Sequence, residues 1–165
     1  YRQISMSEAQ DIMNKEKAID VLNSLIEINN DRIEGYETAS KETEEQDLKA
    51  MFAQFMQTSV KCKQDLISEV TKMNGTPIEG TRTTGKFFRV WMDVKAALTG
   101  KDRKAVLDSC EYGEDVAVGA YAKALENNLN DISAEQHTML NVQHAIIKAD
   151  HDKVKNMRDR LVVQD

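Results

Sequence analysis

Residues 105–125 read AVLDSCEYGEDVAVGAYAKAL, and this stretch sets the pattern for the rest of the chain. Its inward positions recur at alternating steps of three and four residues, which predicts one buried face of a helix. That face consists of Leu107, Cys110, Glu114, Ala117, Tyr121 and Ala124. Glu114 therefore falls in the middle of a stripe that is otherwise largely apolar. Because an unpaired buried carboxylate is costly, Glu114 is expected to be neutral, hydrogen-bonded, paired with a cation or bound to a metal.

The composition predicts a single all-α domain. The chain has 165 residues, of which 41% are hydrophobic and 30% charged, and this suits one domain with a substantial core. It contains one proline and seven glycines, and its long uninterrupted stretches favour helix. We expect residues 1–165 to form one domain, with residues 1–13 as a loosely ordered extension because sustained helical periodicity begins only after them.

The net charge and the two cysteines limit which cellular location and which partners are expected. A net charge of −6 repels nucleic acid and anionic membranes, and no groove of basic and aromatic residues offsets it. No apolar run approaches membrane-spanning length, so neither a nucleic acid nor a membrane is an expected partner. Cys62 and Cys110 lack metal-type spacing and are expected to be buried free thiols in a reducing compartment. The first ten residues, YRQISMSEAQ, lack the apolar core of a signal peptide, so a cytoplasmic location is expected.

Two long helices are predicted in the first half of the chain. The first covers residues 14–40, after a short turn that Ser7 and Gln10 could cap, and its inward line is Ile19, Leu22, Ile26, Asn29, Ile33 and Tyr36. Asn29 lies midway along this line and would need buried hydrogen-bond partners. The second helix follows Asp47 as N-cap, ends at Asn74-Gly75, and carries the stripe Leu48, Met51, Phe55, Ser59, Cys62, Leu66 and Met73. Its midpoint is again small and polar.

A crossover with a short helix is predicted next. The sequence TPIEGTRTTG at residues 76–85 is irregular, and a helix over residues 84–99 follows, ending at Gly100. Phe87, Trp91, Val94 and Leu98 share one side of it, and we expect this face to pack on the other helices or on a second subunit. The crossover helix is thus the expected contact for a homo-oligomer or a protein partner. Seven basic residues between Arg82 and Lys104 are interpreted as a solvated helix face, with a phosphate or acidic-partner site as the alternative.

The second half of the chain predicts two further long helices. One runs from about Asp102 to Asn127, and a capping box of Ser133 and Gln136 opens the other. The last helix carries Leu140, Ile147, Val154 and Leu161 at heptad spacing, interleaved with His137, His144 and His151. Neighbouring histidines on that line are two turns apart, about 10 Å, so they cannot chelate one ion without ligands from other helices. We interpret the three histidines in one of two ways. Either their ring nitrogens are hydrogen-bonded to partners in the core, or they form a half-exposed seam, meaning a line of partly exposed side chains along the helix.

The two halves repeat one pattern of polar positions. Asn29 precedes Tyr36 by seven residues, as Glu114 precedes Tyr121, and the helices that follow carry inward pairs at i and i+3. These pairs are Ser59 with Cys62 and Lys148 with His151. Two such hairpins joined by a long crossover predict four long helices around one core, with a polar layer at mid-height.

The chain resembles the ferritin-like superfamily over about residues 16–160. More narrowly, the stretches NNDRIEGYETA, WMDVKAALTGKD, CEYGEDVAVGAY and KADHDKV are similar to an uncharacterised bacterial family of ferritin-like four-helix bundles, a domain of unknown function with some members described as stress-related. The superfamily binds two metals with one Glu from each of two helices and a Glu-x-x-His pair from each of the others. Carried onto this sequence, the pattern matches Glu114 and His151, while Asn29, Ser59, Cys62 and Lys148 stand at other ligand positions.

Three functional hypotheses follow. The first is a non-catalytic ferritin-like bundle whose degenerate metal site is replaced by a polar core layer of Asn29, Ser59, Cys62, Glu114, Lys148 and His151, closed by hydrogen bonds or by a Lys148–Glu114 ion pair. It implies no catalytic residue, no cofactor and no metal ligand. The second is a metal-dependent oxidase, peroxidase or iron-handling protein with an altered site of Glu114, His151, Cys62 and His144. The third is a small-molecule pocket beside Phe87, Phe88 and Trp91.

Overall fold

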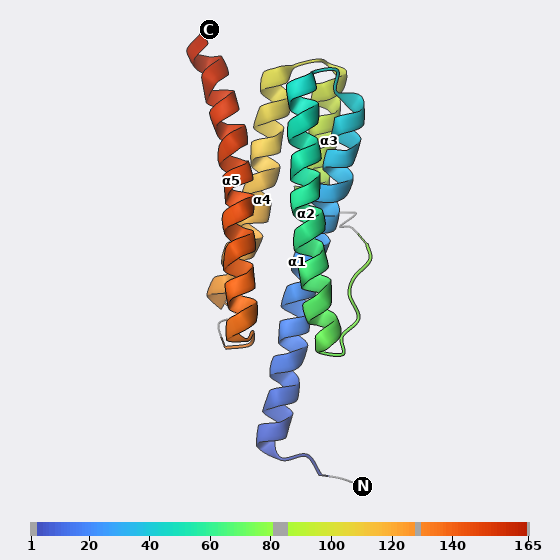
Figure 1. The fold of residues 1–165 in the computed structure, drawn as a ribbon, viewed down its shortest axis with the longest axis vertical. Coiled ribbons are helices and arrows are strands. Elements are labelled where there is room, and N and C mark those ends of the chain that lie inside the picture. The colour runs from blue at the N-terminus through green and yellow to red at the C-terminus, as the bar shows by residue number, and fades with distance from the viewer. Residues whose placement is uncertain (1–2, 81–85, 128–129, 165) are drawn as a thin grey trace.

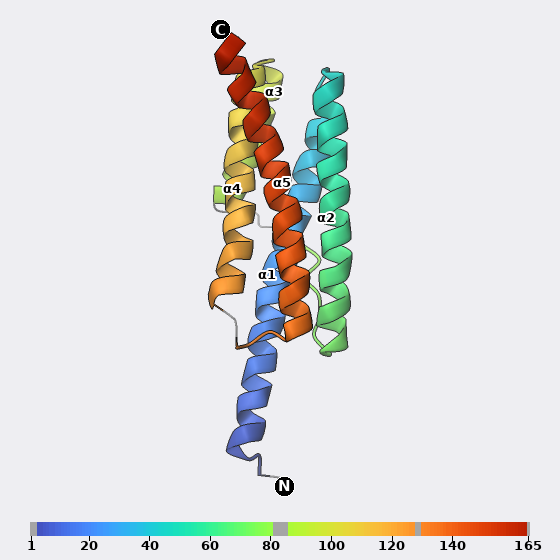
Figure 2. The same cartoon turned by 60° about the vertical axis from the view of Figure 1, so that its left-hand side comes forward.

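The computed structural model describes residues 3–80, 86–127 and 130–164, and these residues form five α-helices and no strand (Figure 1). Four helices are long, and they are α1 (Met6–Glu42), α2 (Gln46–Lys72), α4 (Arg103–Asn127) and α5 (Ala134–Gln164). The shorter α3 (Lys86–Thr99) precedes α4. Helices α1 and α2 form one antiparallel hairpin and α4 and α5 another, and the hairpins lie side by side with α1 and α5 running in the same direction (Figure 2). The predicted all-α class is confirmed.

Helix α1 begins earlier than predicted. It starts at Met6 rather than near residue 14, and the cap is Ser5, whose Oγ accepts a hydrogen bond from the Glu8 N–H at 3.1 Å. The predicted cap at Ser7 is therefore wrong. The first turns of α1 project beyond the other helices and are largely exposed (Figure 1). They contribute no buried side chain until Ala18, which explains why hydrophobic periodicity could not reveal them.

The ends of α2 and α3 share one capping geometry. Helix α2 stops as predicted, because Asn74 adopts a positive φ of 61° and the Gly75 N–H bonds to the Val70 carbonyl at 2.9 Å. At the end of α3 the corresponding residue is Lys101, with φ 56°, rather than the predicted Gly100. The residue with positive φ at the end of α3 is therefore one position later than Gly100, where it was expected.

The predicted starts of α4 and α5 are confirmed, whereas the predicted N-cap of α2 is wrong. Asp102 caps α4 by accepting from the Ala105 N–H at 3.1 Å, and Ser133 and Gln136 form the predicted capping box before α5, with bonds of 3.0 and 3.1 Å. Asp47 is not the N-cap of α2, since that position belongs to Glu45. Asp47 lies inside the first turn and pairs with Arg103 instead.

Two asparagines of α1 hold the start of the crossover. Asn23 donates to the Thr76 carbonyl at 3.1 Å and accepts from the Ile78 N–H at 2.9 Å. One heptad later, Asn30 donates to the Gly80 carbonyl at 2.9 Å. The irregular backbone after α2 therefore runs along α1 and has its polar groups satisfied by amide side chains.

Helix α3 packs on α1 and α4 of the same chain. The Trp91 ring meets the Tyr36 ring edge-on, with centroids 4.7 Å apart, and it lies directly over Gly35. Val90 lies against Gly113 of α4, and Val94 is buried. The prediction that this face packs on the other helices is confirmed for Trp91 and Val94. The predicted start of the helix at residue 84 lies outside the described residues, as do the side chains of Phe87 and Phe88.

The basic segment around α3 finds acidic partners within the chain. The α1–α2 turn carries Glu42, Glu44, Glu45 and Asp47, and these residues pair with Lys95, Lys101 and Arg103 at distances from 2.6 to 3.8 Å. These pairs are largely exposed and each contributes little to stability. They account for the clustering of basic residues among the described part of this segment.

The interior consists of two apolar clusters placed one above the other along the helices. One is built around Leu22, Leu25, Leu66, Val70, Ala117, Tyr121, Leu140 and Ile147. The other is built around Tyr36, Leu48, Phe52, Phe55, Val94, Leu107, Cys110 and Val154. All six positions of the predicted α4 face are buried. Within the described ranges, none of the helices has the length and apolar character that crossing a membrane requires.

Candidate functional site: a buried polar layer

A layer of polar side chains separates the two apolar clusters. Its central residues, Arg32, Ser59, Glu114 and Asp150, lie between the two clusters along their helices. Tyr36 belongs to the second cluster, and Tyr121 and Gln143 extend the layer into the first. We call this set the polar layer, and its members are Asn29, Arg32 and Tyr36 of α1, Ser59 of α2, Glu114 and Tyr121 of α4, and Gln143 and Asp150 of α5. All are buried, so the four long helices meet through hydrogen bonds and charge at this level.

Arg32 connects all four long helices. Its side chain is fully buried, and Nη2 and Nε lie 2.8 and 3.3 Å from Oε1 of Glu114 on α4. Nη1 donates to Ser59 Oγ of α2 at 2.5 Å, and Nη2 also donates to Asp150 Oδ2 of α5 at 3.1 Å. One guanidinium therefore binds two buried carboxylates and satisfies a hydroxyl, and its single positive charge offsets one of their two negative charges.

Tyr36 completes the surroundings of Glu114. Its hydroxyl donates to the same Oε1 atom that Arg32 binds, and its ring lies 5.4 Å from the Arg32 guanidinium carbon. Burial, and then the neighbouring Glu114 carboxylate, raise the pKa of Tyr36 well above its usual value. Tyr36 thus acts as a neutral donor, and the carboxylate is held by both a charge and a hydroxyl.

A second chain of hydrogen bonds also crosses all four long helices. Asn29 of α1 donates to the Tyr121 hydroxyl of α4 at 2.9 Å, and that hydroxyl donates to Gln143 Oε1 of α5 at 2.7 Å. Gln143 Nε2 then donates to the backbone carbonyl of Cys62 on α2 at 3.3 Å. Because buried polar groups are costly when unpaired, this chain and the Arg32 contacts both disfavour a shift of any helix relative to its neighbours.

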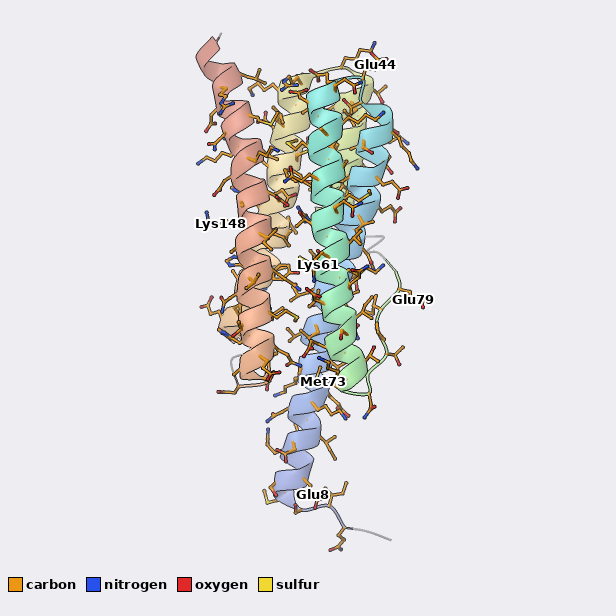
Figure 3. The ribbon with its side chains drawn as sticks, viewed as in Figure 1. Glu8, Glu44, Lys61, Met73, Glu79 and Lys148 are labelled. Carbon is orange, nitrogen blue, oxygen red and sulfur yellow. The ribbon has the colours of Figure 1, made fainter. Side chains whose placement is uncertain are left out.

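The structure brings together some of the residues predicted for the layer and separates others. Asn29, Ser59 and Glu114 lie in it, and Cys62 supplies its backbone carbonyl. Lys148 does not, since its side chain is 57% exposed and pairs with Asp152 at 3.2 Å on the outer side of α5 (Figure 3). The predicted Lys148–Glu114 ion pair is therefore wrong, and Arg32 provides the cation.

His151 also lies outside the polar layer. It is half-buried between α5 and α4, where its Nε2 lies 2.6 Å from Asp115 Oδ1 and 3.9 Å from Glu111 Oε1. The inward positions of α5 are Gln143, Ile147, Asp150 and Val154, so a residue next to one of them points toward the edge of the helix pair. His137, His144 and His151 are all half-buried, which confirms the predicted seam.

Sequence reasoning missed the central residue, Arg32. The predicted inward line of α1 followed Ile26 and Ile33 and so passed over Arg32. A detectable signal was the strict alternation of steps of four and three through Ala18, Leu22, Leu25, Asn29, Arg32, Tyr36 and Ala39, all of which are buried. Asp150 and Gln143 of α5 were missed as well, because the predicted layer followed Lys148 and His151 on that helix.

Both cysteines are expected to resist thiol reagents in the folded protein. Cys62 and Cys110 are buried and unpaired, and burial raises the pKa of Cys62 to about 11 and that of Cys110 further. Since the thiolate is the reactive form, a reagent such as Ellman's should label neither thiol until denaturant is added. Rapid reaction of one thiol per native chain would contradict this, and mass mapping would identify it.

Asp150 is expected to give the stability a measurable pH dependence. Burial raises its pKa to about 6, outweighing the opposite effect of the Arg32 guanidinium. A carboxyl group whose pKa is raised on folding stabilises the fold most below its unfolded pKa, and that contribution is lost as the pH rises through about 6. The free energy of unfolding of Asp150→Asn, relative to wild type, should therefore increase between about pH 4.5 and about pH 7. Urea unfolding of both proteins at several pH values measures this difference, and a constant difference would contradict the assignment.

Comparison with known proteins identifies a family but no activity. A family model described as a domain of unknown function (DUF2383) matches residues 17–127, which include the polar-layer residues of α1, α2 and α4. No curated protein matches the chain.

Proposed function

The chain belongs to the DUF2383 family, a domain of unknown function, and we propose that it is a non-catalytic ferritin-like four-helix bundle whose centre is closed by a cation of its own. The directions of α1, α2, α4 and α5, with one long crossover between α2 and α4, support the ferritin-like assignment. The observation that carries the proposal is the Arg32 guanidinium, which contacts the other three long helices inside the core, and that superfamily builds its metal sites in the bundle core.

The carboxylates at the centre already have a cationic partner without a metal. A di-metal centre places two divalent ions among several carboxylates, whereas this layer has two carboxylates, Glu114 and Asp150, and one fixed cation between them. A guanidinium has no redox chemistry and no open coordination position, and its donors occupy the carboxylate oxygens that face it. On this proposal the layer fixes the register of the helices, in place of the metal.

The biological activity then depends on the outer surface. We infer a role in assembly or partner binding, in the bacterial cytoplasm, and a stress-related role is the one that the family resemblance implies. Helix α3 supports the idea of a contact surface, because Trp91 faces the other helices while Met92 is 54% exposed. The crossover helix therefore remains the expected contact for a second copy or another protein.

Aerobic incubation with ferrous iron tests the proposal, and no di-iron centre should form. Arg32 and its two carboxylates leave no place for two cations separated by the usual distance of about 3.5–4 Å. After removal of loose iron, metal analysis should find fewer than two irons per chain, with no absorption from an oxo-bridged pair. Two tightly bound irons per chain would overturn the proposal in favour of an oxidase or iron-handling protein. The count of two also separates a central di-metal site from a single ion bound at the surface.

A further inference from the structure

We propose that Glu111, Asp115 and His151 form a binding site for one divalent transition-metal ion of the zinc type, on the outer side of the α4–α5 hairpin. These three residues each offer a ligand atom, and the three atoms lie within 4.8 Å of one another. The site is separate from the polar layer and uses none of its side chains. Of the three residues, only His151 is a ligand candidate from the sequence pattern, and there its expected partner is Glu114 on the inward face.

The helix geometry places the three ligands together. Glu111 and Asp115 are four residues apart on α4 and so lie on one face of that helix. His151 approaches from the antiparallel α5, with Nε2 2.6 Å from Asp115 Oδ1 and 3.9 Å from Glu111 Oε1. Donor atoms around a tetrahedral zinc ion lie about 3.3 Å apart when the bonds are about 2.0–2.1 Å. To reach that spacing, the 2.6 Å contact would have to lengthen and the wider separations, which do not exceed 4.8 Å, would have to shorten.

The imidazole is oriented for metal binding through Nε2. Its other nitrogen, Nδ1, lies 3.0 Å from Asp152 Oδ1, and Asp152 is itself held by Lys148 at 3.2 Å. With the Nδ1 proton donated to Asp152, Nε2 is the nitrogen that faces Asp115 and Glu111. Metal-binding histidines commonly have this arrangement, in which a carboxylate fixes the ring and the tautomer.

The two carboxylates have different surroundings, and both suit a metal ligand. Glu111 is largely buried, and Arg158 binds its Oε2 atom, which leaves Oε1 directed toward His151. Asp115 is 59% exposed and gives access from solvent. Three protein ligands would leave at least one position for water. A metal bound between Nε2 and Asp115 Oδ1, which lie 2.6 Å apart, would displace any proton that these two atoms hold.

The ligand types select the class of ion. An imidazole together with two carboxylates suits zinc and the neighbouring first-row divalent ions. Magnesium and calcium prefer sites made of oxygen alone, so they should compete poorly. The competing interpretation is a simple ion pair between a protonated His151 and the surrounding aspartates, and it predicts no specific binding of zinc.

Calorimetric titration of the untagged 165-residue chain with zinc chloride tests the site. Wild type should bind one Zn²⁺ per chain, and Asp115→Asn or His151→Gln should weaken binding at least tenfold. Asp152→Ala, which removes only the positioning carboxylate, should weaken it by about 10–100-fold. Because Asp115 is exposed, Asp115→Asn should retain the fold, and a circular dichroism spectrum checks this.

His137→Gln is the matched control, since His137 lies on the same helix and its side chain bonds only to Asn141 of that helix in the described contacts. Its affinity for zinc should equal that of wild type, and magnesium should give no binding heat in any variant. The proposal is overturned if wild type fails to bind zinc, or if Asp115→Asn and His151→Gln bind it as tightly as wild type. Neither result bears on Arg32 or on the proposed non-catalytic centre.

Discussion

Replacing Arg32 with methionine is expected to lower the free energy of unfolding by about 3–5 kcal/mol, the range observed when one partner of a buried ion pair is removed. Glu114 would lose both of its Arg32 hydrogen bonds, and Asp150 would lose its neighbouring cation, while both carboxylates remain buried. The Ser59 hydroxyl would also lose its bond to the guanidinium. Urea unfolding at neutral pH, followed by circular dichroism, measures the change.

Lys148→Met is the matched control for Arg32→Met, because it makes the same kind of substitution on the exposed side of α5. Its effect should stay within about 0.5 kcal/mol. Adding Glu114→Gln and Asp150→Asn to Arg32→Met should recover much of the loss, since no charge is then buried without a partner. If Arg32→Met proved as mild as Lys148→Met, Arg32 would not be the residue that closes the layer.

Gly35→Ala is expected to destabilise the protein by about 2–3 kcal/mol, at the upper end of the range for overpacking. A Cβ atom at Gly35 would overlap three atoms of the Trp91 indole, which is a rigid group already packed against Tyr36. The gain in helix propensity from glycine to alanine, about 1 kcal/mol, is too small to compensate. Thermal unfolding and the change in Trp91 fluorescence should show that α3 has moved away from α1.

Gly119→Ala is the control for this prediction. Gly119 lies on the exposed side of α4, and an added Cβ would meet no atom within 4 Å. This variant should gain up to about 1 kcal/mol through helix propensity alone. In addition, Gly35→Ala should cost little in a Trp91→Leu background, because the overlapping ring is gone. A Gly35→Ala protein as stable as Gly119→Ala would contradict the close packing of α3.

The fold could be predicted from the sequence wherever one local signal was sufficient. The inward face around Glu114, the end of α2 at Asn74 and the capping box of Ser133 and Gln136 each depend on residues a few positions apart. The first turns of α1 could not be predicted in this way, because their side chains are exposed and carry no periodic signal. The end of α3 shows another limit of sequence-based prediction. Lys101 adopts a positive φ, and no sequence pattern indicates that a lysine will take this conformation.

The candidate site was harder to predict because burial of a charge depends on partners from distant segments. Glu114 stood out as a carboxylate among apolar residues, and a partner cation was correctly considered. The choice between Arg32 and Lys148 depended on which face of each helix points inward. The inward face of α1 includes Arg32 rather than its neighbour Ile33, and the inward face of α5 excludes Lys148. The predicted spacing was shifted by about one residue on each helix. The outer group of Glu111, Asp115 and His151 depends on the pairing of α4 with α5, so it became visible only in the structure.

The crossover held by Asn23 and Asn30 has a consequence for oligomerisation. Each hairpin packs mainly through its own two helices, and the long segment between α2 and α3 is the covalent link that keeps the second hairpin close to the first. If the hairpins separate, the α4–α5 hairpin of a neighbouring chain offers Glu114 and Asp150 to Arg32 just as well. A domain-swapped dimer that exchanged the second hairpins would therefore keep every contact of the polar layer.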